Sequence, residues 1–213
     1  MTTLGISTTA PAALGFDTNT VLTAETASTL RSQGYVFCMR YVGLQAEGAG
    51  DLSRNEAESI LTAGLLLGIV QHATKSQLDG SLGTYNGKNA ATNAANVGTP
   101  AGVTLWCDLE GTNSTSSENT IAYVNAWASA VTDAGFVPGL YVGPNSGLSA
   151  SQLYHSLTIA HYWKAASKVP WVDERGFQML QGLSVATSAG VQIDPDIACY
   201  DAKGDRFTLV APR

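Results

Sequence analysis

The stretch Leu105-Trp106-Cys107-Asp108-Leu109-Glu110-Gly111 gives the first indication of the fold. Its apolar run predicts a buried strand that ends in two acids. Side chains alternate between the faces of a strand, so Asp108 and Glu110 point the same way, with Cα atoms roughly 6.5 Å apart. Two carboxylates on one sheltered face do not both ionise easily, which divides them into an acid and a base. The stretch therefore predicts a catalytic pair or, alternatively, a strand that runs into a solvated loop.

Strand-like and helical patterns alternate along most of the chain. The expected strands start near residues 13, 36, 66, 103, 137, 159, 177 and 191. Such alternation implies parallel strands joined by crossover helices, and eight strands close a single (β/α)8 TIM-type barrel. The last two crossings, 166–176 and 182–190, are too short for regular helices. An open doubly wound sheet is the alternative fold, although the chain has no glycine-rich nucleotide motif after its first strand.

The segments outside the strands define the domain organisation. We expect residues 1–12 to form a flexible N-terminal arm and residues 13–213 to form one barrel domain. The polar, glycine-rich stretch 73–87 predicts a long loop before a helix over 88–97. The tail at 206–210 predicts an added edge strand.

The composition excludes several classes of protein. Of the 213 residues 45% are hydrophobic and 13% are charged, so disorder is not expected. The net charge is −6 without a Lys/Arg cluster, which argues against nucleic acid as a partner. The longest apolar run, 65–70, is too short to span a bilayer, so we expect no membrane insertion. Three widely spaced cysteines match neither a disulfide framework nor a zinc site.

Acidic residues follow three of the expected strands. Asp17 ends the first, Asp108 and Glu110 end the fourth, and Asp194 with Asp196 end the eighth. In a barrel these strand ends converge on one mouth, where active sites are built. Two readings fit five converging acids: a divalent-metal site with oxygen ligands, or a glycoside hydrolase with two working carboxylates.

Aromatic residues near the same strand ends favour a glycoside hydrolase over a metal site. Tyr41, Tyr141 and Trp163 would offer rings beside the carboxylates, although ordinary core packing is the alternative for each. Gln178 and Gln181 are further candidates for hydrogen bonds to sugar hydroxyls, with simple exposure to solvent as the alternative for each. We expect His72, at the end of the third strand, to be a satisfied polar residue and not a catalytic one.

Short motifs resemble those of a known family. They are Gly15-Phe16-Asp17, Gly34-Tyr35-Val36-Phe37 followed by Arg40-Tyr41, Trp106-Cys107-Asp108-Leu109-Glu110, Tyr162-Trp163-Lys164-Ala165 and Gln192-Ile193-Asp194. Together they resemble the glycoside-hydrolase-like TIM-barrel domain of unknown function, which is similar to glycoside hydrolase family 25, the Chalaropsis-type lysozymes. The resemblance spans about residues 14–200.

This resemblance implies roles for the acids. Glu110 would be the general acid, Asp108 would assist by stabilising the acetamido group or the developing positive charge, and Asp17 and Asp194 would position water or sugar. The implied substrate-binding residues are Arg40, Tyr41, Tyr141, Trp163 (as a sugar platform), Gln178 and Asp196. Arg40 could also pair with Asp17 or Glu110, and pairing with Glu110 would weaken its role as an acid.

The resemblance implies a peptidoglycan-type glycan as the substrate, cut as a lysozyme or muramidase cuts it. Two alternatives stay open: a barrel that binds glycan without turnover, because activity does not follow from fold, and a metal-dependent hydrolase that uses the acid cluster. We expect no cofactor, no resident metal and a monomer. The N-terminus lacks a signal-peptide pattern, so we expect action at the cell wall after non-classical export, phage-type release or trimming of a leader.

Overall fold

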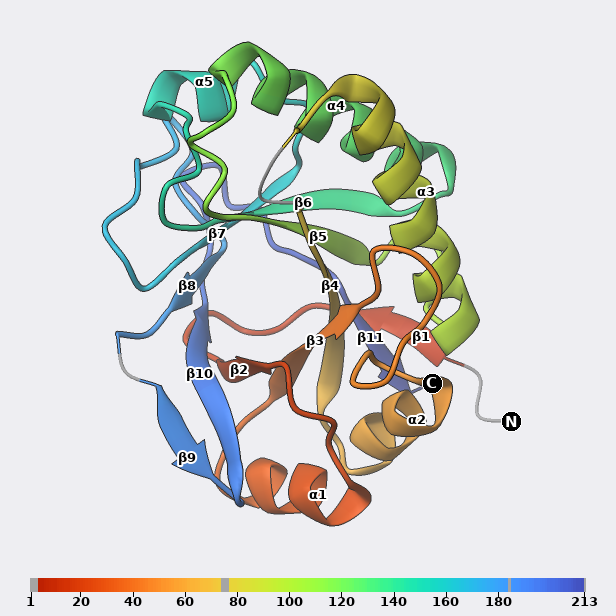
Figure 1. Ribbon diagram of the computed structural model, residues 1–213. Helices are drawn as coiled ribbons and strands as arrows, with labels where there is room; N and C mark the ends of the chain where they lie inside the picture. The colour runs from red at the N-terminus through yellow and green to blue at the C-terminus, as the bar shows by residue number, and fades with distance from the viewer. Residues whose placement is uncertain (1–3, 74–76, 184, 213) are drawn as a thin grey trace.

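Within residues 4–73, 77–183 and 185–212, which the computed structural model describes, eight strands close into a barrel with helices around it (Figure 1). The strands are β1 (Leu4–Ser7), β2 (Leu14–Thr18), β3 (Phe37–Val42), β4 (Leu66–His72), β5 (Thr104–Leu109), β6 (Val137–Val142), β7 (His161–Lys164), β8 (Met179–Gln181), β9 (Ala186–Ser188), β10 (Val191–Ala198) and β11 (Leu209–Pro212). The helices are α1 (Ala24–Ser32), α2 (Arg54–Thr62), α3 (Gly80–Val97), α4 (Ser117–Asp133) and α5 (Ala150–His155).

The expected barrel is confirmed, with one strand reversed. The ring runs β2-β3-β4-β5-β6-β7-β8-β10 and closes where β10 pairs with β2. Seven of these strands are parallel, but β10 is antiparallel to both β8 and β2. A parallel return needs a crossover of a dozen or more residues. The link after β8 is shorter and folds as a β9–β10 hairpin, so β10 runs the opposite way.

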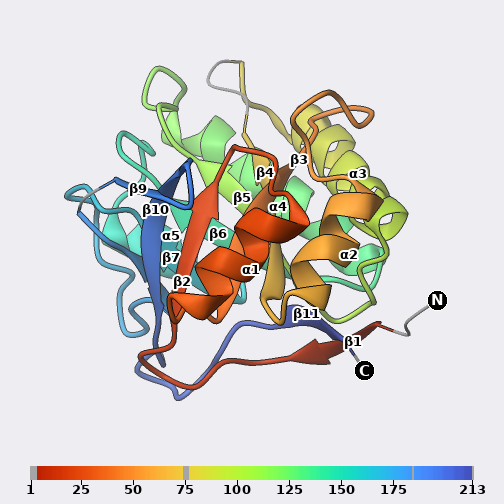
Figure 2. The same cartoon turned by 90° about the horizontal axis from the view of Figure 1, so that it is seen from below.

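The two ends of the barrel differ. The C-terminal ends of the parallel strands meet at one end, which we call the mouth. At the other end, which we call the floor, β11 pairs with β4 and β1 pairs with β11 (bottom of Figure 2). We expected a flexible arm over residues 1–12, but Leu4–Ser7 is a strand; residues 1–3 lie outside the described part of the chain.

Helix α3 begins at Gly80, where a loop was expected to continue to residue 87. The Asp79 side chain accepts a hydrogen bond from the backbone N–H of Leu82 and caps the helix. The glycines that suggested a loop instead allow close packing on α4. A Cβ at Gly83 would lie 2.2 Å from the backbone oxygen of Tyr123. Tertiary contact therefore overrides the low helix propensity of glycine. The rest of that expected loop includes residues 74–76, which lie outside the described residues.

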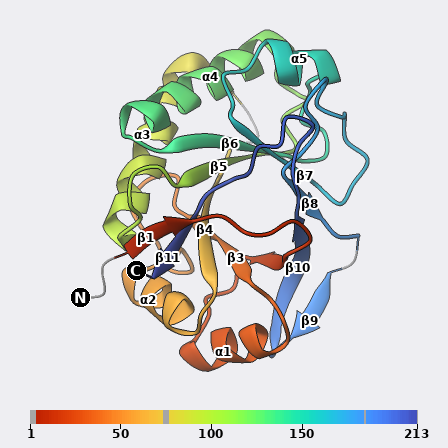
Figure 3. The same ribbon diagram turned by 180° about the vertical axis from the view of Figure 1, so that it is seen from behind.

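The barrel wall has two faces with different partners. Inward side chains, among them Phe37, Trp106 and Trp163, form an aromatic core together with Phe207, which precedes β11. Outward side chains of most strands pack under the helices. No described helix follows β7 or β8, so no helix covers the outer faces of β8 and β10 (Figures 1 and 3). Leu14 and Ile197, paired across β2 and β10, are exposed there.

Candidate functional site

Three strands bring four predicted catalytic acids to the mouth. Asp17 lies near the end of β2, Asp108 near the end of β5, and Glu110 directly after β5. We expected Asp194 and Asp196 to end a parallel strand, and that expectation is wrong because β10 enters the barrel from the mouth. Asp194 nevertheless stands opposite Asp17 in the β10–β2 register, so the reversal keeps it beside the first-strand acid.

Among the acids at the mouth, Asp17 has the pKa that departs furthest from its ordinary value. Its side chain is buried, at 4% exposure. Burial raises the pKa of Asp17 to about 7, and the charges of Asp194 and Asp108 add to the rise. Gln181 Nε2 opposes this shift by donating a 2.7 Å hydrogen bond to Asp17 Oδ2, and the Tyr41 hydroxyl lies 3.5 Å from the other oxygen. Asp17 can therefore hold or release a proton near neutral pH.

Asp108 is fixed by a histidine on the neighbouring strand. His72 and Asp108 are register partners across β4 and β5, and His72 Nδ1 lies 2.7 Å from Asp108 Oδ2. The His72 ring is stacked on Tyr41, with centroids 4.3 Å apart and planes 17° apart. The second carboxylate oxygen of Asp108 is buried without a hydrogen-bond partner among the described residues. The pair orients Asp108 and leaves that oxygen as an acceptor in the interior of the mouth.

Glu110 is more exposed than Asp108 and lies beside Tyr141. Gly143 makes the room, because a Cβ there would lie 2.4 Å from Glu110 Cβ. Burial raises the pKa of Tyr141, and the charges of Asp108, Asp17 and Glu110 raise it further, so its hydroxyl stays protonated. That hydroxyl donates to Gln181 Oε1 at 3.0 Å. One glutamine thus links Tyr141 to Asp17.

Trp163 and Asp196 lie inside the barrel, where they are 0% exposed. Trp163 Nε1 donates to Asp196 Oδ1 at 3.0 Å, and Asp196 Oδ2 has no hydrogen-bond partner among the described residues. Burial raises the pKa of Asp196 well above its ordinary value, and Asp17 and Asp194 add to the rise. The expected roles of Trp163 as a sugar platform and of Asp196 as a sugar ligand are therefore wrong, since neither side chain reaches the surface.

Arg40 and Gln178 point away from the barrel interior, and their predicted substrate contacts are also wrong. Arg40 donates through Nε to Glu56 Oε1 at 2.7 Å, in a buried pair under α2, and contacts neither Asp17 nor Glu110. Gln178 accepts from the backbone N–H of Tyr162 and donates to Asp201. Alternation explains both positions, because Met39, Tyr41 and Met179 take the inward places next to them.

Sequence reasoning missed the contacts of two residues of the site. Gln181 was expected, with Gln178, to hydrogen-bond sugar hydroxyls and not to bind Asp17, and His72 was expected to be a satisfied polar residue. The alternation of side chains along β8 could have identified Gln181. If Met179 faces inward, Gln181 also faces inward and Gln178 faces outward. For His72 the signal was its place at the strand end next to the one that carries Asp108.

The arrangement suits acid–base chemistry. Burial raises the pKa of both Asp17 and Asp194, and His72 holds Asp108 in place, so the mouth combines protonatable carboxyl groups with an oriented one. In the part of the chain that the structure describes, no three His, Cys, Asp or Glu side chains are grouped to hold a metal ion. None of the described helices is both long and apolar enough to cross a membrane.

Comparison with known proteins identifies a family. The sequence profile of the family described as "Rv2525c-like, glycoside hydrolase-like domain" matches residues 28–198. No curated protein matches the chain.

Solved structures share the fold at low sequence identity. An uncharacterised protein of B. stearothermophilus has a TM-score of 0.64 at 20% identity, covering 87% of this chain and 95% of that one. The bacterial lysozyme of Streptomyces coelicolor has a TM-score of 0.59 at 15% identity, covering 88% and 92%. A family 25 glycosyl hydrolase of Bacillus anthracis has a TM-score of 0.62 at 10% identity, covering 88% and 89%.

Proposed function

The chain belongs to this glycoside hydrolase-like family, and from that premise we propose that it hydrolyses a peptidoglycan-type glycan in the manner of a muramidase. One observation carries the proposal: Asp17, Asp108, Glu110 and Asp194 come from three strands to one mouth. The S. coelicolor lysozyme and the B. anthracis family 25 enzyme support the substrate class, because both share the fold.

In the proposed mechanism Glu110 protonates the glycosidic oxygen of the leaving sugar. It is the most suitable donor because it is partly exposed, whereas Asp108 is 3% exposed and tied to His72. Asp108 then stabilises the positive charge that develops at the anomeric carbon, or orients the 2-acetamido group of the sugar. Asp17 and Asp194 position the water or the sugar, and Tyr141 keeps a protonated hydroxyl beside Glu110.

Binding without turnover is the second candidate, and a specific observation favours it. Asp17 and Asp108 are almost completely buried, at 4% and 3% exposure. A barrel in which Asp17 and Asp108 are buried could still bind a glycan through Glu110 and the loops of the mouth. Activity has to be measured directly, because the fold is shared by proteins with different functions.

The decisive experiment is mass spectrometry of the soluble products released from purified peptidoglycan. Wild type is compared with Glu110→Gln, which removes the acid but keeps the shape, and with Glu58→Gln, an exposed glutamate on α2, as a matched control. We expect wild type and Glu58→Gln to release fragments with a reducing N-acetylmuramic acid end, and Glu110→Gln to lose at least about two orders of magnitude in rate.

Three other results would reject this proposal in different ways. Equal product from Glu110→Gln would remove Glu110 as the acid. Activity lost on addition of a chelator and restored by a divalent metal would support metal-dependent hydrolysis. Glycan binding with no product from several wall types would support the second candidate.

A further inference from the structure

A hollow of about 490 Å³ lies on the outer wall near the floor, away from the acids of the mouth. Its lining comes from the segment before β8 and the segment after β10, and Leu180 of β8 forms its wall. Ala198 at the end of β10 pairs with Met179 at the start of β8, which places these segments at the floor end. The hollow exists because no helix covers the outside of β8 and β10, and its volume is typical of small-molecule sites.

Two exposed aromatic rings border the hollow. Trp171 is 57% exposed and Tyr200 is 45% exposed. The Trp171 ring is nonetheless held in place, since it packs edge-on against Phe177 with centroids 5.2 Å apart. Gly176 makes room for it, because a Cβ there would lie 2.8 Å from the indole. A tryptophan fixed in position but left open to water is unusual, because this residue is mostly buried.

The charged groups around the hollow favour a neutral ligand. Arg175 is occupied by Asp201 at 2.6 Å and by Asp205 at 2.7 Å, so its charge is compensated. Glu174 adds an exposed carboxylate at the rim. A cation already lies over one ring, as the Arg206 guanidinium is 5.2 Å from the Tyr200 centroid. Aromatic rings for C–H groups, with the Glu174 carboxylate as an acceptor for hydroxyls, match the two sides of a pyranose ring.

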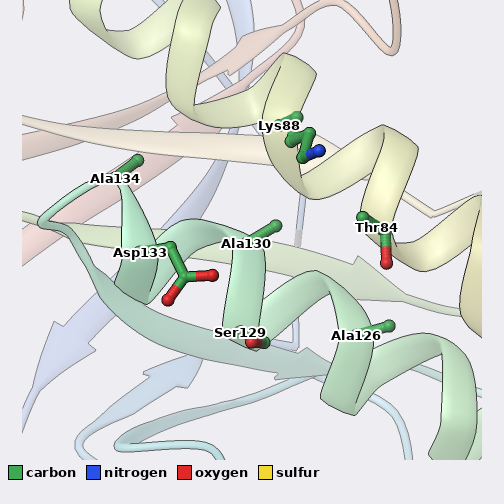
Figure 4. A pocket seen from close by; sticks show the side chains of 7 residues that line it. All are labelled: Thr84, Lys88, Ala126, Ser129, Ala130, Asp133 and Ala134. Atoms are coloured by element: carbon green, nitrogen blue, oxygen red, sulfur yellow. The ribbon is translucent and has the colours of Figure 1, made fainter.

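A second hollow, of about 500 Å³, offers no such chemistry. It lies between α3 and α4, and Figure 4 shows small and polar side chains around it. Thr84 and Lys88 come from α3, and Ser129 and Asp133 come from α4. None of the described residues that line it is aromatic, so it offers no ring for a sugar face.

We propose that the hollow bordered by Trp171 and Tyr200 is a second binding site for neutral N-acetylated glycan, separate from the mouth. The choice of glycan rests on the proposed function, whereas the site itself rests on the rings and the hollow. A site on the outer wall would hold one part of a polymer while another part enters the mouth. It would raise affinity for long chains and leave cleavage of short ones unchanged.

The tryptophans of this chain provide a direct measurement. Trp106, Trp127 and Trp163 are 0% exposed, so fluorescence that acrylamide quenches belongs to Trp171. The probe is chitotetraose, a tetramer of N-acetylglucosamine, added to Glu110→Gln so that no cleavage interferes. We expect saturable protection of Trp171, with its quenching constant reduced about twofold or more, as for a ring that becomes covered.

Sedimentation with insoluble peptidoglycan measures what the site contributes to binding of the polymer. We expect Trp171→Ala and Tyr200→Ala to weaken this binding by about tenfold, which is about 1.4 kcal/mol. Tyr85→Ala, which removes an exposed aromatic on α3 outside the hollow, should bind like wild type. Release of product from short oligosaccharides should be unchanged in all three variants.

The experiments test the second glycan-binding site and the proposed hydrolase activity independently. No protection of Trp171 by chitotetraose, or equal loss of binding in Tyr85→Ala, would overturn the second site whatever the activity. Protection that follows protein concentration and accompanies dimers in analytical ultracentrifugation would also overturn it, because the hollow would then be a contact between protein chains. Protection without product from any wall would retain the site and reject the hydrolase.

Discussion

Gln181 Nε2 donates a 2.7 Å hydrogen bond to Asp17 Oδ2 across 164 residues of sequence. The bond connects β8 to β2 across β10, and the same side chain accepts from Tyr141. It is the stronger of the two hydrogen bonds that oppose the effect of burial on the pKa of Asp17, the other being that of Tyr41. The protonation of Asp17 therefore depends in part on a residue that is neither acidic nor near it in the chain.

Replacing Gln181 with leucine should raise the pKa of Asp17 above its present value of about 7. The variant removes the donor that stabilises the carboxylate, while burial and the neighbouring charges remain. A ¹³C NMR titration of the aspartate carboxyl groups measures the shift. Gln192→Leu, an exposed glutamine on β10, serves as the control. An unmoved Asp17 titration in Gln181→Leu would show that the bond has no electrostatic effect.

Asp17→Asn should change how stability depends on pH. The pKa of Asp17 is raised from 3.8 to about 7 in the folded protein. The native state therefore binds more protons than the unfolded state between about pH 4 and pH 7, and the free energy of unfolding falls as pH rises through this window. Asparagine does not ionise, so the variant does not lose this free energy of unfolding as the pH rises. We expect the variant to match wild type near pH 4 and to exceed it by up to about 4 kcal/mol at pH 8.

Urea unfolding at pH 4 and pH 8 tests the Asp17 prediction. Asp133→Asn, an exposed position at the end of α4, should follow wild type at both values. If Asp17→Asn also follows wild type at both values, burial does not perturb Asp17 in the manner described.

His72→Phe should slow turnover without unfolding the protein. Phenylalanine keeps a ring to stack on Tyr41 but loses the 2.7 Å contact with Asp108. A hydrogen bond to a charged group contributes about 1.5–3 kcal/mol, so kcat on a soluble glycan should fall on the order of 10- to 100-fold. His155→Phe, an exposed position on α5, should keep full activity. An unchanged kcat in His72→Phe would mean that the pair is only structural.

Arg40→Met should reduce stability and not substrate affinity. Arg40 is 0% exposed, and its loss leaves Glu56 buried without its cation. Breaking such a pair costs about 3–5 kcal/mol, whereas replacing both partners with apolar residues costs less. We therefore expect the Arg40→Met/Glu56→Met double variant to recover part of the loss in urea unfolding. A weakened KM with unchanged stability would restore Arg40 to the substrate site.

The barrel could be predicted from alternating strand and helix patterns, and the acids from their places after strands. The direction of β10 could not be assigned, although the shortness of the preceding link was visible. The link is a hairpin because Ala189 and Gly190 form its turn, and both of these residues have positive φ. The sequence alone did not identify this turn. Helix α3 was cut short because Gly83 and Gly87 suggest a loop until α4 is known to pack on them.

By itself the sequence determined which side chains are available and which of them share a face. Alternation along the stretch 105–110 predicted that Asp108 and Glu110 share a face, and the charges of both act on Tyr141. Only the tertiary structure decided what each charge meets. Arg40 forms a buried ion pair with Glu56 of α2. Trp163 donates a hydrogen bond to the buried Asp196, and Gln181 donates one to Asp17. The reason is physical: strand geometry is local, whereas burial, hydrogen bonding and the pKa of a carboxyl group depend on neighbours that the chain brings from far away.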